Sequence, residues 1–358
     1  MTTIGQAFDP SKNSLNAIRL FMAATVIVSH SWLVSGLGAP PMLTGTDPGL
    51  VAVASFFAIS GYLVTASRVR ARSLWTYLWR RFLRIYPGFI AALVVVALVF
   101  APVSTLLTPA NSLDWASAIR YVLANAGLFI NQTTIDSTLT TNAFPFIWNI
   151  PLWTLFYEAL CYLLVGIVVS FVPRRALGAV LAALLILCTA VSLAFRVAPG
   201  MLAMPILDHA TSLASFFLAG AVMYLYRDSV PSSGLLAALA VVLAVAFAGL
   251  GLFEPLAAVL VAYVMLYAGS RLPLSRVGRR NDVSYGMYVY GFPVQQLIVL
   301  AMGGSALLPV WAFAIVSVAL TIPLAWVSWL CVEKPALRLR RRDLSGRLSE
   351  PLSSAGPA

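Results

Sequence analysis

The segment Leu15-Asn16-Ala17-Ile18-Arg19-Leu20-Phe21-Met22-Ala23-Ala24-Thr25-Val26-Ile27-Val28-Ser29-His30-Ser31-Trp32 decides the fold class of this chain. It is long and apolar enough to cross a bilayer as a helix, yet it carries an arginine and a histidine. Arg19 and His30 are about three helical turns apart, so both project from one face with a rise of about 16 Å between them. Ionisable groups inside a membrane segment are costly, so each is a functional candidate. The alternative is an arginine that extends to the interface and a histidine that is hydrogen-bonded inside a bundle.

The composition extends this conclusion to the whole chain. Of its 358 residues, 61% are hydrophobic and 10% are charged, and the mean hydropathy is +0.91. These values exclude a soluble domain and predict an all-α, polytopic integral membrane protein. The net charge of +11 lies between apolar segments, so membrane topology explains it and no nucleic-acid partner is expected. The three cysteines lie far apart in apolar runs, which supports neither a disulfide framework nor a metal site.

About ten transmembrane helices fit the apolar runs, at roughly twenty residues per crossing. We expect them near residues 15–33, 50–67, 86–107, 148–172, 177–195, 209–226, 234–252, 255–270, 284–302 and 308–332. If the N-terminus is cytoplasmic, most basic residues fall in inner connections, and the outer ones hold only Arg120 and Arg196. This asymmetry predicts two cytoplasmic termini and a multi-pass protein of the inner (plasma) membrane. The membrane domain is then expected over residues 1–342, with a disordered cytoplasmic tail at 343–358.

The longest outer connection, at about residues 109–147, is polar and rich in Asn, Ser and Thr. Loops of this length are commonly functional. We expect this one to cover a site that faces outward.

Two further motifs lie in the second expected span and at the inner mouth of the third. Ser60-Gly61 allows close approach of a neighbouring helix, and simple packing is the alternative to a functional role. Arg81 and Arg84 are one turn apart, so their guanidinium groups can converge on a phosphate. The alternative for both arginines is topology signalling and contact with anionic lipid.

The segment Pro151-Leu152-Trp153-Thr154-Leu155-Phe156-Tyr157-Glu158 opens the fourth expected span. Thr154 and Glu158 share one helical face. A carboxylate inside a span normally pairs with another polar group, and His30 is the expected partner at similar depth, although a structural role is the alternative. The closing Val332-Glu333-Lys334-Pro335 is most simply an interfacial ion pair followed by the end of a helix.

Together these residues resemble the membrane-bound acyltransferase-3 family. The resemblance rests on five motifs that appear in the family's order: Arg19 with His30, Phe56 to Leu63, Arg81-x-x-Arg84-x-x-Pro87, Trp153 to Glu158, and Glu333 to Pro335. The chain departs from the family at Gly291, where many relatives have a histidine within the stretch that begins at Ser284-Tyr285. This departure leaves His30 as the main candidate for acid–base chemistry.

The resemblance implies an O-acyltransferase that moves an acyl group, expected to be acetyl, from cytoplasmic acyl-CoA to a hydroxyl of a carbohydrate or glycolipid acceptor. In this hypothesis Arg19, Arg81 and Arg84 bind the CoA phosphates. His30 takes the acceptor proton while Glu158 orients the imidazole, and an acyl-histidine intermediate is the less favoured variant.

The remaining candidates are Ser60, Gly61, Trp153 and Tyr285, which are expected to be structural or to line the pocket. No metal and no tightly bound cofactor is expected. The alternative functions are a transporter or flippase for an acylated or anionic substrate, for which we find no paired inverted halves, and a non-catalytic scaffold.

Overall fold

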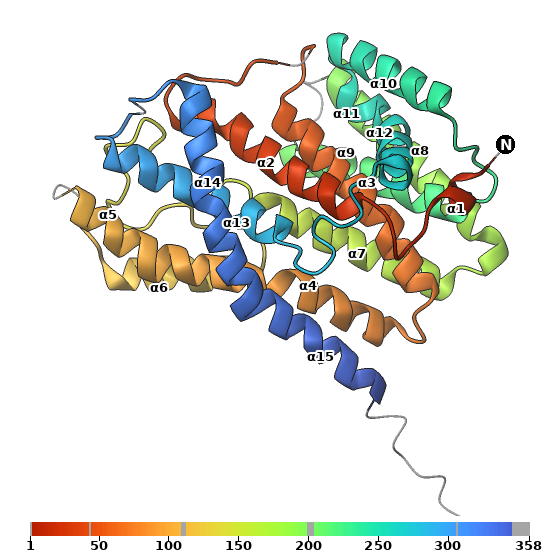
Figure 1. The fold of residues 1–358 in the computed structure, drawn as a ribbon, viewed down its shortest axis with the longest axis horizontal. Coiled ribbons are helices and arrows are strands. Elements are labelled where there is room, and N and C mark those ends of the chain that lie inside the picture. The colour runs from red at the N-terminus through yellow and green to blue at the C-terminus, as the bar shows by residue number, and fades with distance from the viewer. Residues whose placement is uncertain (1, 43, 109–111, 199–203, 306, 346–358) are drawn as a thin grey trace, which may run out of the picture.

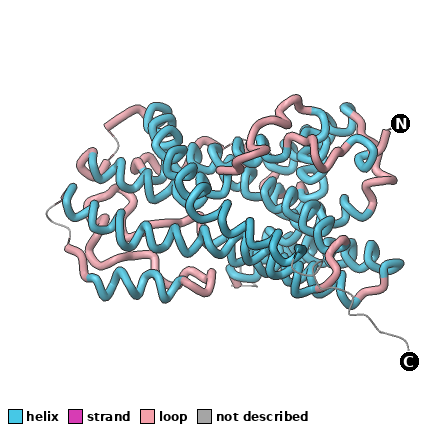
Figure 2. Tube along the Cα trace, turned by 60° about the horizontal axis from the view of Figure 1, so that its bottom comes forward, coloured by secondary structure: helices cyan, strands magenta, loops and turns pink. Residues whose placement is uncertain are grey.

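The computed structural model describes residues 2–42, 44–108, 112–198, 204–305 and 307–345, which form helices and loops without a β-strand (Figures 1 and 2). The helices, of which η1 and η2 are short π-helical segments, are α1 (Ile4–Ala7), α2 (Leu15–Val34), α3 (Pro48–Val69), α4 (Leu74–Val95), η1 (Val96–Phe100), α5 (Ala101–Leu107), α6 (Trp115–Asn125), α7 (Trp153–Phe171), α8 (Arg174–Val197), α9 (Pro205–Leu225), α10 (Gly234–Gly249), α11 (Phe253–Leu256), α12 (Ala258–Arg271), α13 (Ser284–Ala301), α14 (Val310–Ser328), η2 (Trp329–Glu333) and α15 (Lys334–Ser345). The expected all-α fold is therefore confirmed.

Within the described residues, seven helical segments are long and apolar enough to cross a membrane. They begin with α2, α3, α4, α7, α8, α9 and α14. The other three expected spans correspond to α10, α12 and α13, which have 16, 14 and 18 residues. A polytopic membrane protein is thus confirmed, while the count of ten and the cytoplasmic termini stay predictions.

The start of α4 differs most from the expected boundary. The helix begins at Leu74, about three turns before the expected residue 86, and Ser73 caps it by accepting a hydrogen bond from the Thr76 N–H. Arg81 and Arg84 consequently lie inside a regular helix rather than at its mouth. The two arginines therefore contact different neighbours, because side chains three residues apart on a helix differ in direction by about 60° about its axis.

Glycine makes possible the closest packing in the bundle, between α3 and α9. A Cβ atom on Gly61 would overlap with the carbonyl oxygen of Phe217, and one on Gly220 would overlap with that of Ala58. The close helix approach expected at Ser60-Gly61 is therefore confirmed, as is usual for small residues between membrane helices.

The long outer connection contains one helix that the sequence analysis missed, α6, which lies beside α4 (Figure 1). The part that follows α6 is fixed to α13 by side-chain amides. Asn142 donates to the Gln296 carbonyl, Gln296 donates to the carbonyl of Ile147, and Asn149 donates to the carbonyl of Val289. The connection is thereby held against the end of the bundle that is expected to face outward.

The end of the last span also differs from expectation. The chain passes from α14 through η2 into α15, so the helix continues through Pro335 and extends beyond the bundle (Figure 1). Pro335 follows the π-helical segment η2, where the Lys334 N–H donates to the Trp329 carbonyl and the regular i→i−4 pattern is already interrupted. The predicted helix end at this motif is wrong. α15 runs to Ser345, and the rest of the expected tail lies outside the described residues.

Candidate active site

Four helices surround a cavity of about 180 Å³ that we call the outer chamber. Its lining includes His30 from α2, Asp47 and Leu50 at the start of α3, Trp153 from α7 and Tyr288 from α13. Sequence reasoning selected His30 and Trp153, and the structure brings them together. The chamber lies next to the fixed outer connection, since Pro151 at the end of that connection also lines it.

The imidazole of His30 forms no hydrogen bond with any residue that the structure describes. Its ring packs edge-on against Phe292, with 5.3 Å between the ring centroids. Within the described chain neither ring nitrogen forms a hydrogen bond with another residue, and both remain available to a group in the chamber. The alternative of a histidine hydrogen-bonded inside the bundle is therefore not what the structure shows.

Asp47 is the carboxylate that shares the outer chamber with His30. Its Oδ1 atom accepts hydrogen bonds from Ser29 Oγ at 2.5 Å and from the Gly49 N–H at 2.7 Å, which caps α3. Asp47 was not among the residues predicted for the site. The signal was present in Asp47-Pro48-Gly49, because Asp before Pro marks the start of a helix and fixes the carboxylate at its N-terminus.

A smaller inner chamber, of about 40 Å³, lies between the same helices. Arg19, Ser60, Glu158 and Tyr285 are part of its lining, so four predicted residues meet here. Glu158 Oε1 accepts a hydrogen bond from Ser60 Oγ at 3.0 Å and one from the Tyr162 hydroxyl at 2.6 Å. The expected pairing of Glu158 with His30 is not present, because Glu158 lies in the inner chamber and His30 in the outer one.

The two chambers share part of their walls. Val53, Thr154 and Tyr288 line both of them. The Thr154 and Tyr288 hydroxyls are 2.5 Å apart, and each lies 3.0 Å from the Pro151 carbonyl oxygen, so one hydroxyl donates to the other, which donates to the carbonyl. This hydroxyl pair forms the partition between the chamber of His30 and the chamber of Arg19 and Glu158.

Asp282, in the loop before α13, binds two of the predicted arginines. Its Oδ2 atom is 3.0 Å from Arg19 Nη1 and 2.7 Å from Arg84 Nη2, and its Oδ1 atom accepts a hydrogen bond from Ser284 Oγ at 2.5 Å. Burial alone would raise the pKa of Asp282, but the two guanidinium charges outweigh it and hold this pKa below its ordinary value. We call these three charged residues the Asp282 cluster.

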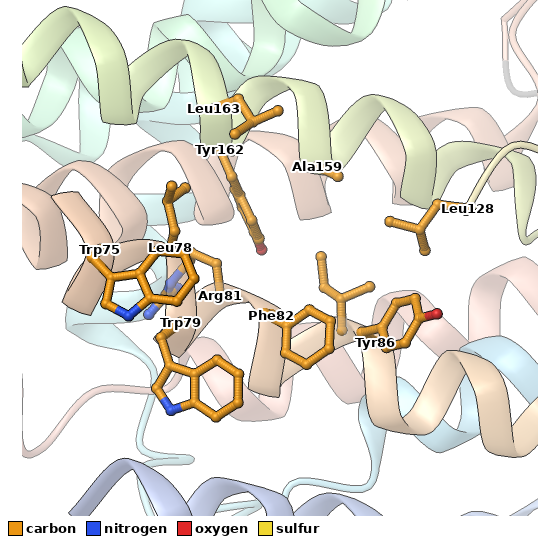
Figure 3. A pocket seen from close by; sticks show the side chains of 11 residues that line it. Trp75, Leu78, Trp79, Arg81, Phe82, Tyr86, Leu128, Ala159, Tyr162 and Leu163 are labelled. Atoms are coloured by element: carbon orange, nitrogen blue, oxygen red, sulfur yellow. The ribbon is translucent and has the colours of Figure 1, made fainter. Parts of the chain in front are cut away.

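Arg81 points to a different place (Figure 3). Its guanidinium lies over the ring of Tyr162, 5.7 Å from the centroid, in an apolar cavity of about 400 Å³ between α4 and α7. Trp75, Trp79 and Phe82 are among the aromatic side chains around it (Figure 3). Arg81 and Arg84 thus do not converge on one phosphate site, because Arg84 turns towards Asp282.

Gly291, the position that departs from the family pattern, packs against α2. A Cβ atom there would be 2.5 Å from Ile27 Cγ1, which is closer than real Cβ contacts. A histidine at this position would displace Ile27, one turn from His30. The structure therefore has no place for a second imidazole at residue 291.

The fold and the chambers define an integral membrane protein with a polar site enclosed by its helices. Comparison with known proteins assigns the reaction class. Residues 12–330 match the model of the acyltransferase-3 family, described as an acyltransferase domain, and the chain belongs to this family.

Two curated relatives are similar over nearly their full lengths. One is the "O-acetyl transferase" of Shigella phage Sf6, with 28% identity over 93% of this chain and 98% of the relative. The other is "Nodulation protein 10" of Rhizobium leguminosarum bv. viciae, with 30% identity over 94% of this chain and 96% of the relative. No solved structure matches. The chain is accordingly a membrane-embedded O-acyltransferase, as its motifs predicted.

Proposed function

We propose that the protein transfers an acyl group, most simply acetyl, from acyl-CoA to a hydroxyl of a carbohydrate-type acceptor at the cell surface. The observation that carries the proposal is the imidazole of His30, which lines the outer chamber and forms no hydrogen bond with any described residue. The name of the Shigella phage relative supports acetyl as the group transferred. A sugar or glycolipid acceptor fits a chamber whose lining combines aromatic and polar side chains, including Trp153 and Thr154.

In the proposed step, His30 removes the proton from the acceptor hydroxyl, and the acceptor oxygen attacks the thioester carbonyl. The C–O bond forms, the C–S bond breaks, and the imidazolium returns its proton to the departing thiolate. The products are the O-acyl ester and free CoA. This direct transfer needs a single base within reach of both substrates, so it requires fewer groups than an acyl-histidine intermediate.

The carboxylates take separate parts in this proposal. Asp47, fixed at the start of α3, stabilises the positive charge that His30 acquires during the reaction. Glu158, with Arg19, lies in the inner chamber, where the acyl-bearing end of the donor would approach the partition formed by Thr154 and Tyr288. The catalytic role of Glu158 proposed from the sequence then needs that partition to open, so that the two chambers join.

The basic residues are proposed to guide the donor from the cytoplasmic side of the inner membrane. Arg19 and Arg84, held by Asp282, give the inner entrance a positive charge. Arg81 faces the separate apolar cavity, so its proposed contact with the donor has the least structural support of the three.

The test is transfer of a radiolabelled acetyl group from acetyl-CoA by purified protein in nanodiscs, followed as labelled acceptor and released CoA. We expect His30→Gln to lower kcat by about 10²- to 10⁴-fold, the usual contribution of a general base. His209→Gln is the matched control, because the chain has two histidines and His209 packs beside Trp153 outside either chamber. Full activity of the folded His30 variant would refute the proposal.

The acceptor is identified by mass spectrometry of cell-surface glycans from cells with and without the gene. The proposal predicts a mass difference of one acyl group per modified sugar, and the size of that difference names the acyl group. Unchanged glycans together with a changed small metabolite would exclude a cell-surface polysaccharide.

A further inference from the structure

A strongly basic cavity lies outside both chambers, at the loop between α12 and α13. It has a volume of about 650 Å³, and its lining includes Arg276, Arg279, Arg280 and Asn281 from this loop and Trp326 from α14. Ligand-binding cavities usually measure about 300–1,000 Å³. The cavity is therefore large enough for a nucleotide-sized molecule, which neither chamber is.

The three arginines of this cavity carry uncompensated charge. Within the described residues, none of Arg276, Arg279 and Arg280 forms a hydrogen bond or an ion pair. The adjacent carboxylate, Asp282, is occupied by Arg19 and Arg84. Three guanidinium groups around one cavity without an acidic partner form a site for a polyanion, because guanidinium binds phosphate oxygens in pairs.

The loop that carries these arginines is anchored at several points. Asn16 Nδ2 donates to the Gly278 carbonyl at 3.0 Å, and Gly278 has a φ of +68°, a conformation that favours glycine. Asn281 Oδ1 accepts hydrogen bonds from Trp329 Nε1 at 3.0 Å and from Lys334 Nζ at 3.4 Å. The backbone of the cavity is thus held by α2, η2 and α15 before any ligand binds, which lowers the cost of ordering it.

The basic cavity and the inner chamber are lined by neighbouring residues of the chain. Asn281 lines the cavity, Asp282 binds Arg19, and Ser284 lines the inner chamber together with Arg19. Four consecutive positions of the chain therefore connect the two spaces. A ligand whose anionic end occupied the basic cavity would therefore lie near the Asp282 cluster, one of whose arginines, Arg19, lines the inner chamber.

We propose that this cavity binds the 3′-phosphate and diphosphate of the CoA donor, with Trp326 as a stacking surface for the adenine base. Arg276, Arg279 and Arg280 then supply one guanidinium for each of the three phosphate groups. Base–aromatic stacking is favourable for any nucleobase, and the indole of Trp326 is 43% exposed. This inference rests on the proposed acyl-CoA dependence and names the residues that recognise the nucleotide end.

The experiment uses the full chain in nanodiscs of phosphatidylcholine and compares acetyl-CoA with its 3′-dephospho analogue. Calorimetry measures binding of CoA and dephospho-CoA, and the transfer assay gives KM and kcat for both donors. We expect Arg276→Gln, Arg279→Gln and Arg280→Gln each to raise the KM for acetyl-CoA by about 10- to 100-fold, the loss typical of a charge-assisted hydrogen bond. kcat should change by less than about threefold, because no bond is made or broken in this cavity.

The control is the double variant Arg174→Gln, Arg175→Gln, which removes two exposed arginines from the start of α8. It should leave both kinetic constants unchanged, because generic surface charge is not what binds the donor. At least one single variant of the basic cavity should bind CoA and dephospho-CoA equally, which identifies the arginine that contacts the 3′-phosphate. Equal loss in the control and in the cavity variants would overturn the inference.

Two outcomes separate the inference from the proposed function. If the wild-type protein transfers acetyl but the three variants keep its KM, the protein is an acyl-CoA-dependent transferase and the inference about this cavity is wrong. If the wild-type protein binds CoA through these arginines but transfers nothing, the inference stands and the proposed reaction fails. Binding of phosphatidylglycerol, in place of CoA, that is lost in the variants would show a lipid headgroup site and overturn the inference.

Discussion

The outer chamber and the Asp282 cluster differ in whether their buried ionisable side chains have partners. In the outer chamber, His30 has no hydrogen-bond partner among the described residues, and its carboxylate neighbour Asp47 is satisfied by Ser29 and Gly49. In the cluster, Arg19 and Arg84 are both bound to one carboxylate. Both regions border the same bundle core.

This difference separates a reactive group from structural ones. Leaving a polar group unpaired inside a membrane bundle is unfavourable, so an unpaired imidazole indicates a place where another molecule completes the interaction. The paired arginines already have a partner in Asp282. Removing that partner should lower the stability of the fold more than it lowers the rate of acyl transfer. Arg19, chosen from the sequence together with His30, belongs with the paired groups, so its proposed part in guiding the donor comes from its charge and not from a free guanidinium.

Removal of the cluster carboxylate is the change with the largest expected effect on stability. Asp282→Asn leaves Arg19 and Arg84 without their counter-charge in a place where the aspartate side chain is only 13% exposed. Breaking a buried pair by removing one partner costs about 3–5 kcal/mol. Thermal unfolding in detergent, followed by tryptophan fluorescence, should show this loss as a lower Tm.

Asp228→Asn provides the matched comparison. Its ion pair with Arg227 is also intact, but the aspartate side chain is 69% exposed. Exposed pairs contribute about 0–1 kcal/mol, so this variant should unfold close to the wild type. Similar shifts in Tm for both variants would contradict the view that the Asp282 cluster is a buried structural unit.

The next largest effects are expected on kcat, from changes to the carboxylates of the two chambers, Asp47 and Glu158. Asp47→Asn keeps a side chain able to cap α3 but removes the negative charge beside His30. Opposite charges several ångströms apart near a protein interior attract each other by about 1–3 kcal/mol. We expect kcat to fall by about 10- to 100-fold, and Glu158→Gln to lower kcat less. A larger effect of Glu158→Gln, measured in the same transfer assay, would show that substrate binding joins the chambers and brings Glu158 to His30.

Much of the fold was predictable from the sequence because the membrane imposes it. A long apolar run must satisfy its backbone polar groups internally, so nearly every expected span coincides with a helix. The chosen residues of the site also came together, since His30 and Trp153 line one chamber and Arg19, Ser60, Glu158 and Tyr285 line the other. Helical spacing alone places Arg19 and His30 on one face.

The pairing of these side chains was not predictable, because the partners are distant in sequence. Arg84 and its partner Asp282 are 198 positions apart, and nothing in either local segment indicates the other. The same reason explains why Ser60 was not predicted as a partner of Glu158, since the two residues are 98 positions apart. Tyr162, the second partner, is only four residues from Glu158 on α7, so helical spacing could have indicated it. Helix α6 was missed because its sequence, WASAIRYVLAN, has only 11 residues, which is too short for a membrane span.

A smaller effect on stability is expected at Gly291, which packs against Ile27, one turn from His30 on α2. Gly291→Ala places a methyl group 2.5 Å from Ile27 Cγ1, and overpacking of this kind costs about 1–3 kcal/mol. Gly127→Ala is the control, because a Cβ atom there meets no atom within 4 Å. If Gly291→Ala unfolds like the control, α2 and α13 have room to separate, and a histidine at this position could be accommodated.

The smallest expected effect is the pH dependence of stability, which follows from the lowered pKa of Asp282. A carboxylate whose pKa is lowered on folding contributes stability that is complete above its unfolded pKa, about 3.9, and is lost only as the pH falls further. The Tm difference between the wild type and Asp282→Asn should therefore be constant from about pH 8 to pH 5 and should narrow below about pH 4. A difference that already changes between pH 8 and pH 5 would mean that another group titrates with the cluster, and Asp282 would not hold Arg19 and Arg84 alone.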